Sequence, residues 1–209
     1  DLIAVTKFLA DTDQFFLNIA MAYCKSVMDA AKSIGEGTIV TAMTRNGKEF
    51  AIKVSGLGER WFVAPVNMPK GLFFTGYSQE EANMDMGDSA ITETFGVGGM
   101  AMIAAPGVTR FVGADGFNAA QEISDEMEEI TFSHNQNLAI PTWDFKGAVV
   151  GIDVRKVVET GITPLINTGI AHKKAGVGQI GAGTVRAPYG CFTQALKGLV
   201  EKYAEEEKN

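Results

Sequence analysis

The sequence predicts an α+β fold, in which a small mixed sheet with a β-hairpin is packed by several helices and joined by glycine-rich loops. Apolar residues at helical spacing fill the N-terminal region, two β-rich runs flank Asn46-Gly47, and a second helical pattern closes the chain at 191–205. Hairpins and separated helices favour α+β over a doubly wound sheet. A length of 209 residues with 46% apolar content predicts one region over 1–209, with a helical lead-in at 1–35 and a core at 36–209.

The lead-in is predicted to be helical because apolar residues from Phe15 to Ala31 recur at helical spacing. Asp11, Thr12 or Asp13 is a suitable cap for the start of this helix, and Gly35 stands where a helix would end.

The segment from Thr38 to Ser55 predicts a hairpin. Apolar and more polar residues alternate from 49 to 55, and Asn46-Gly47 separates the two runs. Asparagine and glycine tolerate the positive φ that both central residues of a type I′ turn require, so that turn is predicted here. Strands are also expected at 61–66 and 72–74.

A polar loop at 83–88 is predicted to lead into one helix over 89–105, capped by Asp88 or Ser89 and ended by Pro106-Gly107. This helix is rich in Gly, Ala and Met and is expected to be buried on most sides. The other predicted elements are an acidic amphipathic helix at 117–130, a strand at 149–152, a helix at 154–160 capped by Asp153, an extended segment at 162–170 and a glycine-rich loop at 176–183.

The composition argues against several functions. The net charge is −7 without a Lys/Arg-rich stretch, so nucleic acid is not an expected partner. No apolar run of 18 residues is present to cross a membrane. Cys24 and Cys191 lie outside any metal-binding spacing, and we expect two reduced, buried thiols in a cytoplasmic protein. No metal site is predicted, although Asp85, Asp88 and Glu93 are residues that could bind a hard cation.

Residues 176–181 (GVGQIG) match the dinucleotide-binding pattern GxGxxG. That pattern needs a strand before it, a helix opening on the third glycine and an acidic residue about 20 positions later in a strand. None of these is predicted, so no cofactor is expected. Backbone N–H groups of such a loop can instead bind an anion, and the alternative is a loop that passes close to another backbone.

The segment 87–94 (GDSAITET) is a second candidate because it stands at a predicted helix N-terminus, which attracts anions. Ser89 and Thr92 would donate hydrogen bonds, and Glu93 would act as a base or as an orienting group. The structural alternative is that Asp88 and Ser89 cap the helix. His172 precedes the glycine-rich loop and is either a general acid or base near neutral pH or a hydrogen-bonded loop residue.

Several segments together resemble the bacterial YlbE/YahG-like proteins: residues 44–50 (TRNGKEF), 54–62 (VSGLGERWF), 87–94, 151–155 (GIDVR) and 167–172 (NTGIAH). The resemblance runs from about residue 13 to 199. Members of this family are about twice as long, which implies that the chain corresponds to the C-terminal half of a subunit. Relatives occur with purine and allantoin breakdown, and one is a subunit of oxamate carbamoyltransferase.

The resemblance implies transfer of a carbamoyl group, from oxalurate and phosphate to oxamate and carbamoyl phosphate, beside a partner similar to the CoA-binding subunit of succinyl-CoA synthetase. Small anionic substrates and an oligomer are therefore expected. Arg60 and Arg155 would hold carboxylate or phosphate groups. On the matching segments the expected catalytic residues are His172, Glu93 and Asp88, and the expected substrate-binding residues are Asn46, Arg60, Ser89, Thr92, Arg155, Asn167, Thr168, Gly178, Gln179 and Gly181.

A non-catalytic structural subunit is the alternative. The apolar helix at 89–105, with Met100 and Met102, would then serve assembly with the CoA-synthetase-like partner. A stand-alone hydrolase is disfavoured because no Ser/His/Asp pattern has a recognisable context.

Overall fold

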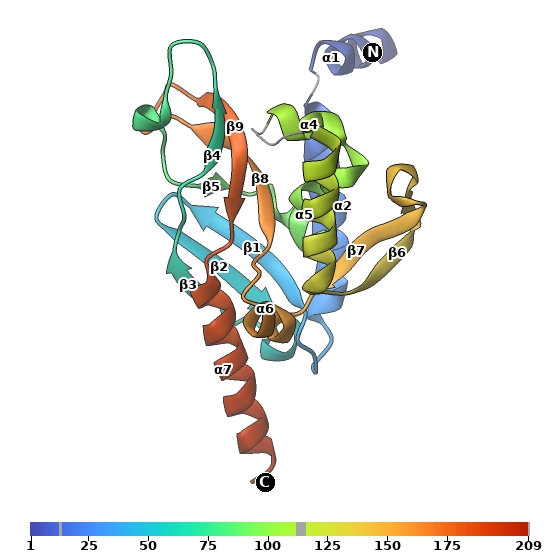
Figure 1. The fold of residues 1–209 in the computed structure, drawn as a ribbon, viewed down its shortest axis with the longest axis vertical. Helices are drawn as coiled ribbons and strands as arrows, with labels where there is room; N and C mark the ends of the chain where they lie inside the picture. The colour runs from blue at the N-terminus through green and yellow to red at the C-terminus, as the bar shows by residue number, and fades with distance from the viewer. Residues whose placement is uncertain (13, 112–115, 209) are drawn as a thin grey trace.

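The computed structural model describes residues 1–12, 14–111 and 116–208, and in these residues the α+β fold is confirmed (Figure 1). The α-helices are α1 (Leu2–Asp11), α2 (Phe15–Lys32), α3 (Ala90–Phe95), α4 (Pro106–Phe111), α5 (Gly116–Glu129), α6 (Val154–Thr160) and α7 (Tyr189–Glu206). Short 3-10 helices are η1 (Ser55–Leu57), η2 (Gln79–Glu81), η3 (Gly98–Ala104) and η4 (Pro141–Trp143). The strands are β1 (Val40–Asn46), β2 (Glu49–Val54), β3 (Phe62–Pro65), β4 (Lys70–Phe73), β5 (Met86–Gly87), β6 (Thr131–Ile140), β7 (Lys146–Ile152), β8 (Leu165–Ala171) and β9 (Gln179–Arg186).

The strands of the described ranges form three sheets rather than one mixed sheet. Their orders are β3-β2-β1-β5, β4-β9-β8 and β6-β7, and neighbouring strands are antiparallel. In Figure 1, α1 stands at one end of the molecule, away from the body, and α7 projects from the other end. The sheets and the remaining helices lie between them.

The largest apolar cluster of the described residues forms the main core, and two smaller clusters lie between α2 and α3 and beside β8 and β9. The alternation predicted at 49–55 places Phe50, Ile52 and Val54 inward on β2, each at most 1% exposed. Met100 of η3 and Phe192 of α7 belong to the same cluster. Because β2, η3 and α7 share one core, the segments that carry the candidate site are held on a packed scaffold.

The predicted hairpin is present, but its turn is not of type I′. Gly47 has φ +85°, whereas the non-glycine residues with positive φ in the described ranges are Asp144 and Phe145. Asn46 remains in β1, and its side-chain oxygen accepts hydrogen bonds from the backbone N–H groups of Lys48 and Glu49. Asn46 therefore supports the turn through its side chain.

The prediction of a single helix over 89–105 is wrong. The helix α3 ends at Gly96, which has φ +114°, and a Cβ there would collide with the carbonyl oxygen of Val149. The chain continues as the 3-10 helix η3, which is kinked at Ala101, and Pro106 begins α4 instead of ending a helix. The predicted burial is nevertheless confirmed, because the residues from 90 to 95 and from 99 to 103 are buried.

The glycine-rich loop predicted at 176–183 is largely a strand. Only its first part is irregular, and β9 begins at Gln179 and pairs with both β8 and β4. A Cβ at Gly181 or Gly183 would collide with the carbonyl oxygens of Leu72 and Lys70 on β4. These glycines thus permit close approach of another backbone, which was the structural alternative for this motif.

Most other predicted elements are confirmed, including the acidic helix α5 and the C-terminal helix α7. Asp153 caps α6, and its Oδ1 accepts from the backbone N–H of Arg155 at 2.9 Å. The helical lead-in consists of α1 and α2. The possible cap Asp13 lies outside the described residues, and Gln14 at the N-cap of α2 makes no side-chain capping bond.

Candidate functional site

Two of the segments singled out in the sequence meet at one cleft of about 490 Å³. The helix α3 brings Ser89, Thr92 and Glu93, and β8 brings Asn167 and Thr168. Gln179 of β9 completes the polar part of the wall. The other lining residues are Gln14, Leu17, Gly98, Val108, Gly169 and Ala182. Six of the predicted site residues therefore surround a single space, which we call the polar cleft.

Ser89 does not cap α3, because its side chain makes no capping hydrogen bond. Its hydroxyl oxygen instead accepts a hydrogen bond from Nη2 of Arg45 at 3.1 Å. Since α3 spans only Ala90–Phe95, its dipole is weak and the predicted anion site at the helix N-terminus has little support. Ser89 is better described as a hydroxyl group that is oriented by a guanidinium group.

Arg45 organises this region and was not among the predicted site residues. Its side chain is 1% exposed and pairs with Asp85, Nε to Oδ2, at 3.0 Å. Nη2 also donates to Oγ1 of Thr168 at 3.2 Å, and that hydroxyl donates to Oδ1 of Asp85 at 2.8 Å. Nη1 of Arg45 is buried without a partner among the described residues. A buried ion pair thus fixes the hydroxyl groups of Ser89 and Thr168, which line the polar cleft.

One signal in the sequence could have identified Arg45. Arg45 follows Met43 by two positions in a predicted strand, so both side chains lie on the same face. Met43 is 3% exposed and Arg45 is 4% exposed. An arginine on the inward face of a strand must be paired, and the polar loop at 83–88 offers two acidic residues, Asp85 and Asp88, of which Asp85 is the one that pairs with it.

Glu93 is 1% exposed and joins three segments. Its Oε1 accepts hydrogen bonds from the backbone N–H groups of Gly99 (2.8 Å) and Asn167 (3.2 Å), and Oε2 accepts from the hydroxyl of Thr92 (3.0 Å). Burial raises the pKa of Glu93 to about 6, against the opposing effect of these hydrogen bonds and of Arg45. A carboxyl group with this pKa can gain or lose a proton near neutral pH.

Asn167 stands between α3 and η3. Its Nδ2 contacts the sulfur of Met102 at 3.3 Å, while its Oδ1 is buried and has no partner among the described residues. The amide therefore keeps an unused acceptor at the edge of the polar cleft.

The remaining predicted residues lie elsewhere. Arg60 is exposed, covers the ring of Phe62 and pairs with Glu201 at 3.7 Å. Arg155 is exposed and pairs with Asp153 at 2.7 Å. Neither arginine lines the polar cleft.

Asp88 and His172 are also outside the polar cleft. Asp88 lines a separate cleft beside α2. His172 lies at the tip of the β8–β9 hairpin, where its Nδ1 accepts from the backbone N–H of Lys174 at 2.8 Å and its ring meets Tyr77 edge to face. Gly178 accepts a hydrogen bond from the backbone N–H of His172. His172 is thus hydrogen-bonded within a loop, as in the structural alternative, and its acid–base role stays a prediction.

Asp85 and Glu93 do not form a cation site with Asp88. Asp85 is engaged by Arg45, and Glu93 is saturated by backbone and hydroxyl donors. In the part of the chain that the structure describes, no group of three or more His, Cys, Asp and Glu side chains is arranged to hold a metal ion. Nor does any described helix have the length and apolar character needed to cross a membrane.

Comparison with known proteins supports the resemblance found in the sequence. The family model described as oxamate carbamoyltransferase subunit AllG matches residues 1–89. Over 197 residues the chain is 72% identical to the oxamate carbamoyltransferase subunit AllG of Escherichia coli K12. Over 199 residues it is 47% identical to YahG of the same organism, an uncharacterized protein. The chain is a relative of AllG and YahG.

These relatives are longer than the chain. The alignments cover 94% and 95% of this chain but 47% of AllG and 42% of YahG, so the chain spans about half the length of the curated relatives it matches. A crystal structure of a conserved protein of unknown function from Enterococcus faecalis V583 has 49% sequence identity and a TM-score of 0.92, and covers 96% of this chain and 48% of that protein. The matched part of that protein therefore has the same fold as this chain.

Proposed function

We propose that the chain is part of a carbamoyltransferase subunit of the oxamate carbamoyltransferase type, and that the polar cleft contributes to the binding of a small anionic substrate. The observation that carries the proposal is the 72% identity to AllG over 197 residues. The gathering of Ser89, Thr92, Glu93, Asn167 and Thr168 around one cleft supports it further.

The proposed reaction is carbamoyl transfer between oxalurate and phosphate. A phosphate oxygen bonds to the ureido carbonyl carbon, the carbon–nitrogen bond to the oxamate part breaks, and that nitrogen takes up a proton. Negative charge gathers on the carbonyl oxygen during the step, so fixed hydrogen-bond donors lower the barrier. The hydroxyl of Ser89 accepts from Arg45 and keeps its own proton available for such an oxygen.

Glu93 is the proposed proton carrier of the polar cleft, since its pKa of about 6 favours exchange near neutral pH. Arg60, Arg155 and His172, which the sequence proposed for anion binding and proton transfer, face solvent away from this cleft. They would reach a substrate only where another chain meets their surface.

A structural subunit is the second candidate function, and one observation favours it. Large apolar side chains are exposed along the N-terminal helices, and a surface of this kind is typical of contact with another protein. They are Leu2, Ile3, Val5, Phe8 and Leu9 of α1 and Phe16, Leu17, Ile19, Tyr23 and Val27 of α2. A partner similar to the CoA-binding subunit of succinyl-CoA synthetase would cover them in the cytoplasm.

The assembly role first considered for Met100 and Met102 is wrong. These side chains are 0% and 2% exposed and belong to the core. The exposed apolar residues of α1 and α2 replace them as the proposed assembly surface.

Steady-state kinetics of the complex with the CoA-synthetase-like partner tests the proposal. Oxamate formation from oxalurate and phosphate is measured for the unmodified complex, for Ser89→Ala and for the control Arg60→Ala. We expect Ser89→Ala to lower kcat/KM by at least about tenfold, as for loss of one oriented donor, and Arg60→Ala to leave it unchanged. Loss of activity in Arg60→Ala alone would move the anion site to that surface. Full activity in both variants, with co-elution of the two subunits retained, would support the structural role.

A further inference from the structure

A second cleft, of about 400 Å³, adjoins the polar cleft. The two share Gly98, Val108 and Asn167 among their lining residues. The other residues of the second cleft are Val97, Ala101, Met102, Ala104, Ala105, Leu138, Ala139, Ile140 and Ala148. Asn167 is thus its one polar side chain among the described residues, and we call this space the apolar cleft.

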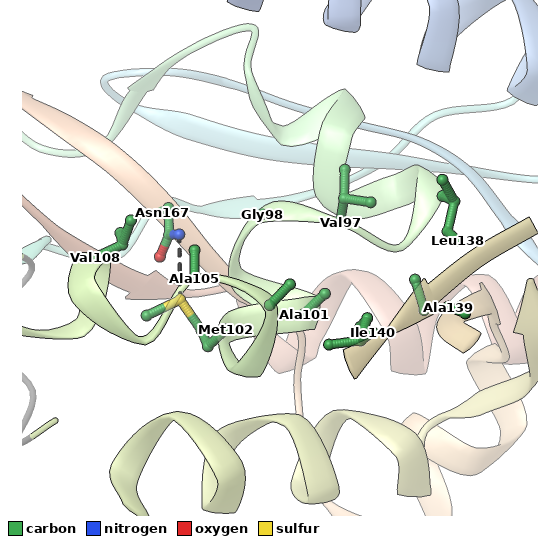
Figure 2. Close-up of a pocket in the computed structure, with 12 residues that line it drawn as sticks. Val97, Gly98, Ala101, Met102, Ala105, Val108, Leu138, Ala139, Ile140 and Asn167 are labelled. Atoms are coloured by element: carbon green, nitrogen blue, oxygen red, sulfur yellow. Dashed lines mark hydrogen bonds between the residues drawn. The ribbon is translucent and has the colours of Figure 1, made fainter. Parts of the chain in front are cut away.

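Six of the twelve residues that line the apolar cleft are glycine or alanine. Figure 2 shows Asn167 and Val108 at one end and Leu138 and Ala139 at the other, with the chain from 97 to 105 passing between. These small side chains leave the space of about 400 Å³ open to a ligand. The kink at Ala101, with φ −130° and ψ 45°, directs the η3 backbone along one side.

The amide of Asn167 gives the apolar cleft a specific chemical preference. Its Nδ2 is directed to the sulfur of Met102, which leaves Oδ1 buried without a partner. A buried acceptor without a donor is costly, and a ligand N–H would remove that cost. A carboxylate or phosphate has no counterpart here, because no cationic side chain is among the lining residues.

We propose that the apolar cleft is a binding site for a small, largely apolar group that carries one N–H donor, and that Asn167 recognises this donor. Binding pockets of this kind combine an apolar lining with a few polar groups that fix orientation. The proposal goes beyond the carbamoyl-transfer function, whose substrates are small and strongly charged. A second ligand, bound beside the polar cleft, is the occupant that this chemistry describes.

Indole and benzofuran form a matched pair of probes, since they share size and shape and differ by N–H against oxygen. Calorimetric titration of the folded protein is expected to give saturable indole binding that is at least about tenfold tighter than benzofuran binding, because a hydrogen-bonding site rejects the analogue that lacks its donor. Asn167→Leu keeps the apolar volume and is expected to abolish the preference. Equal affinity for both probes in the unmodified protein would overturn the role of Asn167.

Two variants on neighbouring elements locate the binding. Ala105→Phe fills the apolar cleft and is expected to abolish indole binding. Arg110→Phe adds the same ring on α4 at a position outside the lining and is expected to leave binding unchanged. Indole binding that survives Ala105→Phe, or no saturable indole binding at all, would overturn the proposal. If Ala105→Phe does not fold, the site is tested in the unmodified protein by a nuclear Overhauser effect between indole and the labelled methyl group of Met102. Absence of this effect would overturn the proposal. None of these measurements uses enzyme activity, so the proposed function is tested separately.

Discussion

At the scale of single residues, the buried carboxyl group of Glu93 links folding to pH. Its pKa is about 6 in the folded protein against an ordinary value of 4.5. Between these values the folded state binds more protons than the unfolded state, so the stability falls as the pH rises through this window. A pKa difference of this size corresponds to about 2 kcal/mol.

Glu93→Gln should remove this pH dependence. The amide oxygen of the new side chain can accept from Gly99 and Asn167, and its NH2 group can donate to Thr92, whose hydroxyl keeps its 2.7 Å bond to the carbonyl of Ser89. Urea denaturation between pH 4.5 and 7 should show a loss of about 2 kcal/mol in the unmodified protein and a flat profile over that window in the variant. The exposed Glu122→Gln serves as the control and should keep the slope. A slope retained in Glu93→Gln would contradict this assignment.

The ion pair between Arg45 and Asp85 should be far more sensitive than a surface pair. Asp85→Asn keeps the shape but leaves a buried guanidinium group uncompensated, and we expect a destabilisation of about 3 kcal/mol or more. Asp29→Asn breaks the exposed pair with Lys25, whose side chains are 55% and 51% exposed, and should cost less than about 0.5 kcal/mol. Chemical denaturation measures the free energy of unfolding of both variants. Equal losses of stability would show that burial does not make the Arg45–Asp85 pair more sensitive than the surface pair.

The sequence predicted the polar cleft at residue level only in part. Ser89 and Glu93 were among the predicted residues because their segment stands at a predicted helix N-terminus, and Thr168 because it lies on a segment that resembles the family. Arg60 was predicted to hold a carboxylate or phosphate group, yet its side chain lies over Phe62 at the surface. Pairing across distant segments, such as Arg45 with Asp85, is a tertiary property that local patterns do not contain.

At the scale of elements, the end of α3 at Gly96 determines where Glu93 lies. Gly96→Ala should destabilise the protein by about 3 kcal/mol or more or prevent folding, because φ is +114° and a Cβ would meet the carbonyl of Val149. Gly107→Ala in α4 is the matched control, since open space surrounds its Cβ position. That control should be neutral or stabilising by up to about 1 kcal/mol. Thermal unfolding of the two variants tests the prediction, which fails if Gly96→Ala melts with the unmodified protein.

Helices and strands could be predicted where buried and exposed residues alternate along the sequence. They were harder to predict where tertiary contacts determine the backbone conformation. The β1–β2 hairpin was predicted because β2 has one buried and one more exposed face. The strand β6 was missed because most of its residues are exposed or partly exposed, so no apolar alternation is present. The continuous apolar pattern over 89–105 does not reveal that Gly96 and Gly98 have positive φ, which divides the segment in space.

At the scale of the whole molecule, α1 stands away from the body and carries five exposed large apolar side chains. This helix has no buried residue, and Leu2 and Ile3 are 81% and 85% exposed. The double variant Leu2→Ser, Ile3→Ser should therefore change the free energy of unfolding by less than about 0.5 kcal/mol while weakening association with the partner and lowering dye binding to the apolar surface. Analytical ultracentrifugation and denaturation provide the two readouts. A large loss of stability would show that α1 packs on the body.

The opposite end of the molecule carries α7, whose buried residues all lie between Cys191 and Leu199. Beyond them Val200 is 62% exposed and the helix projects from the body (Figure 1). Its backbone amides should therefore record two different processes in deuterium exchange. Those near Phe192 and Leu199 exchange only when the whole protein opens, whereas those near Tyr203 exchange by fraying of the last turns. A single helix would thus report both the global stability of the protein and the local winding of its own end.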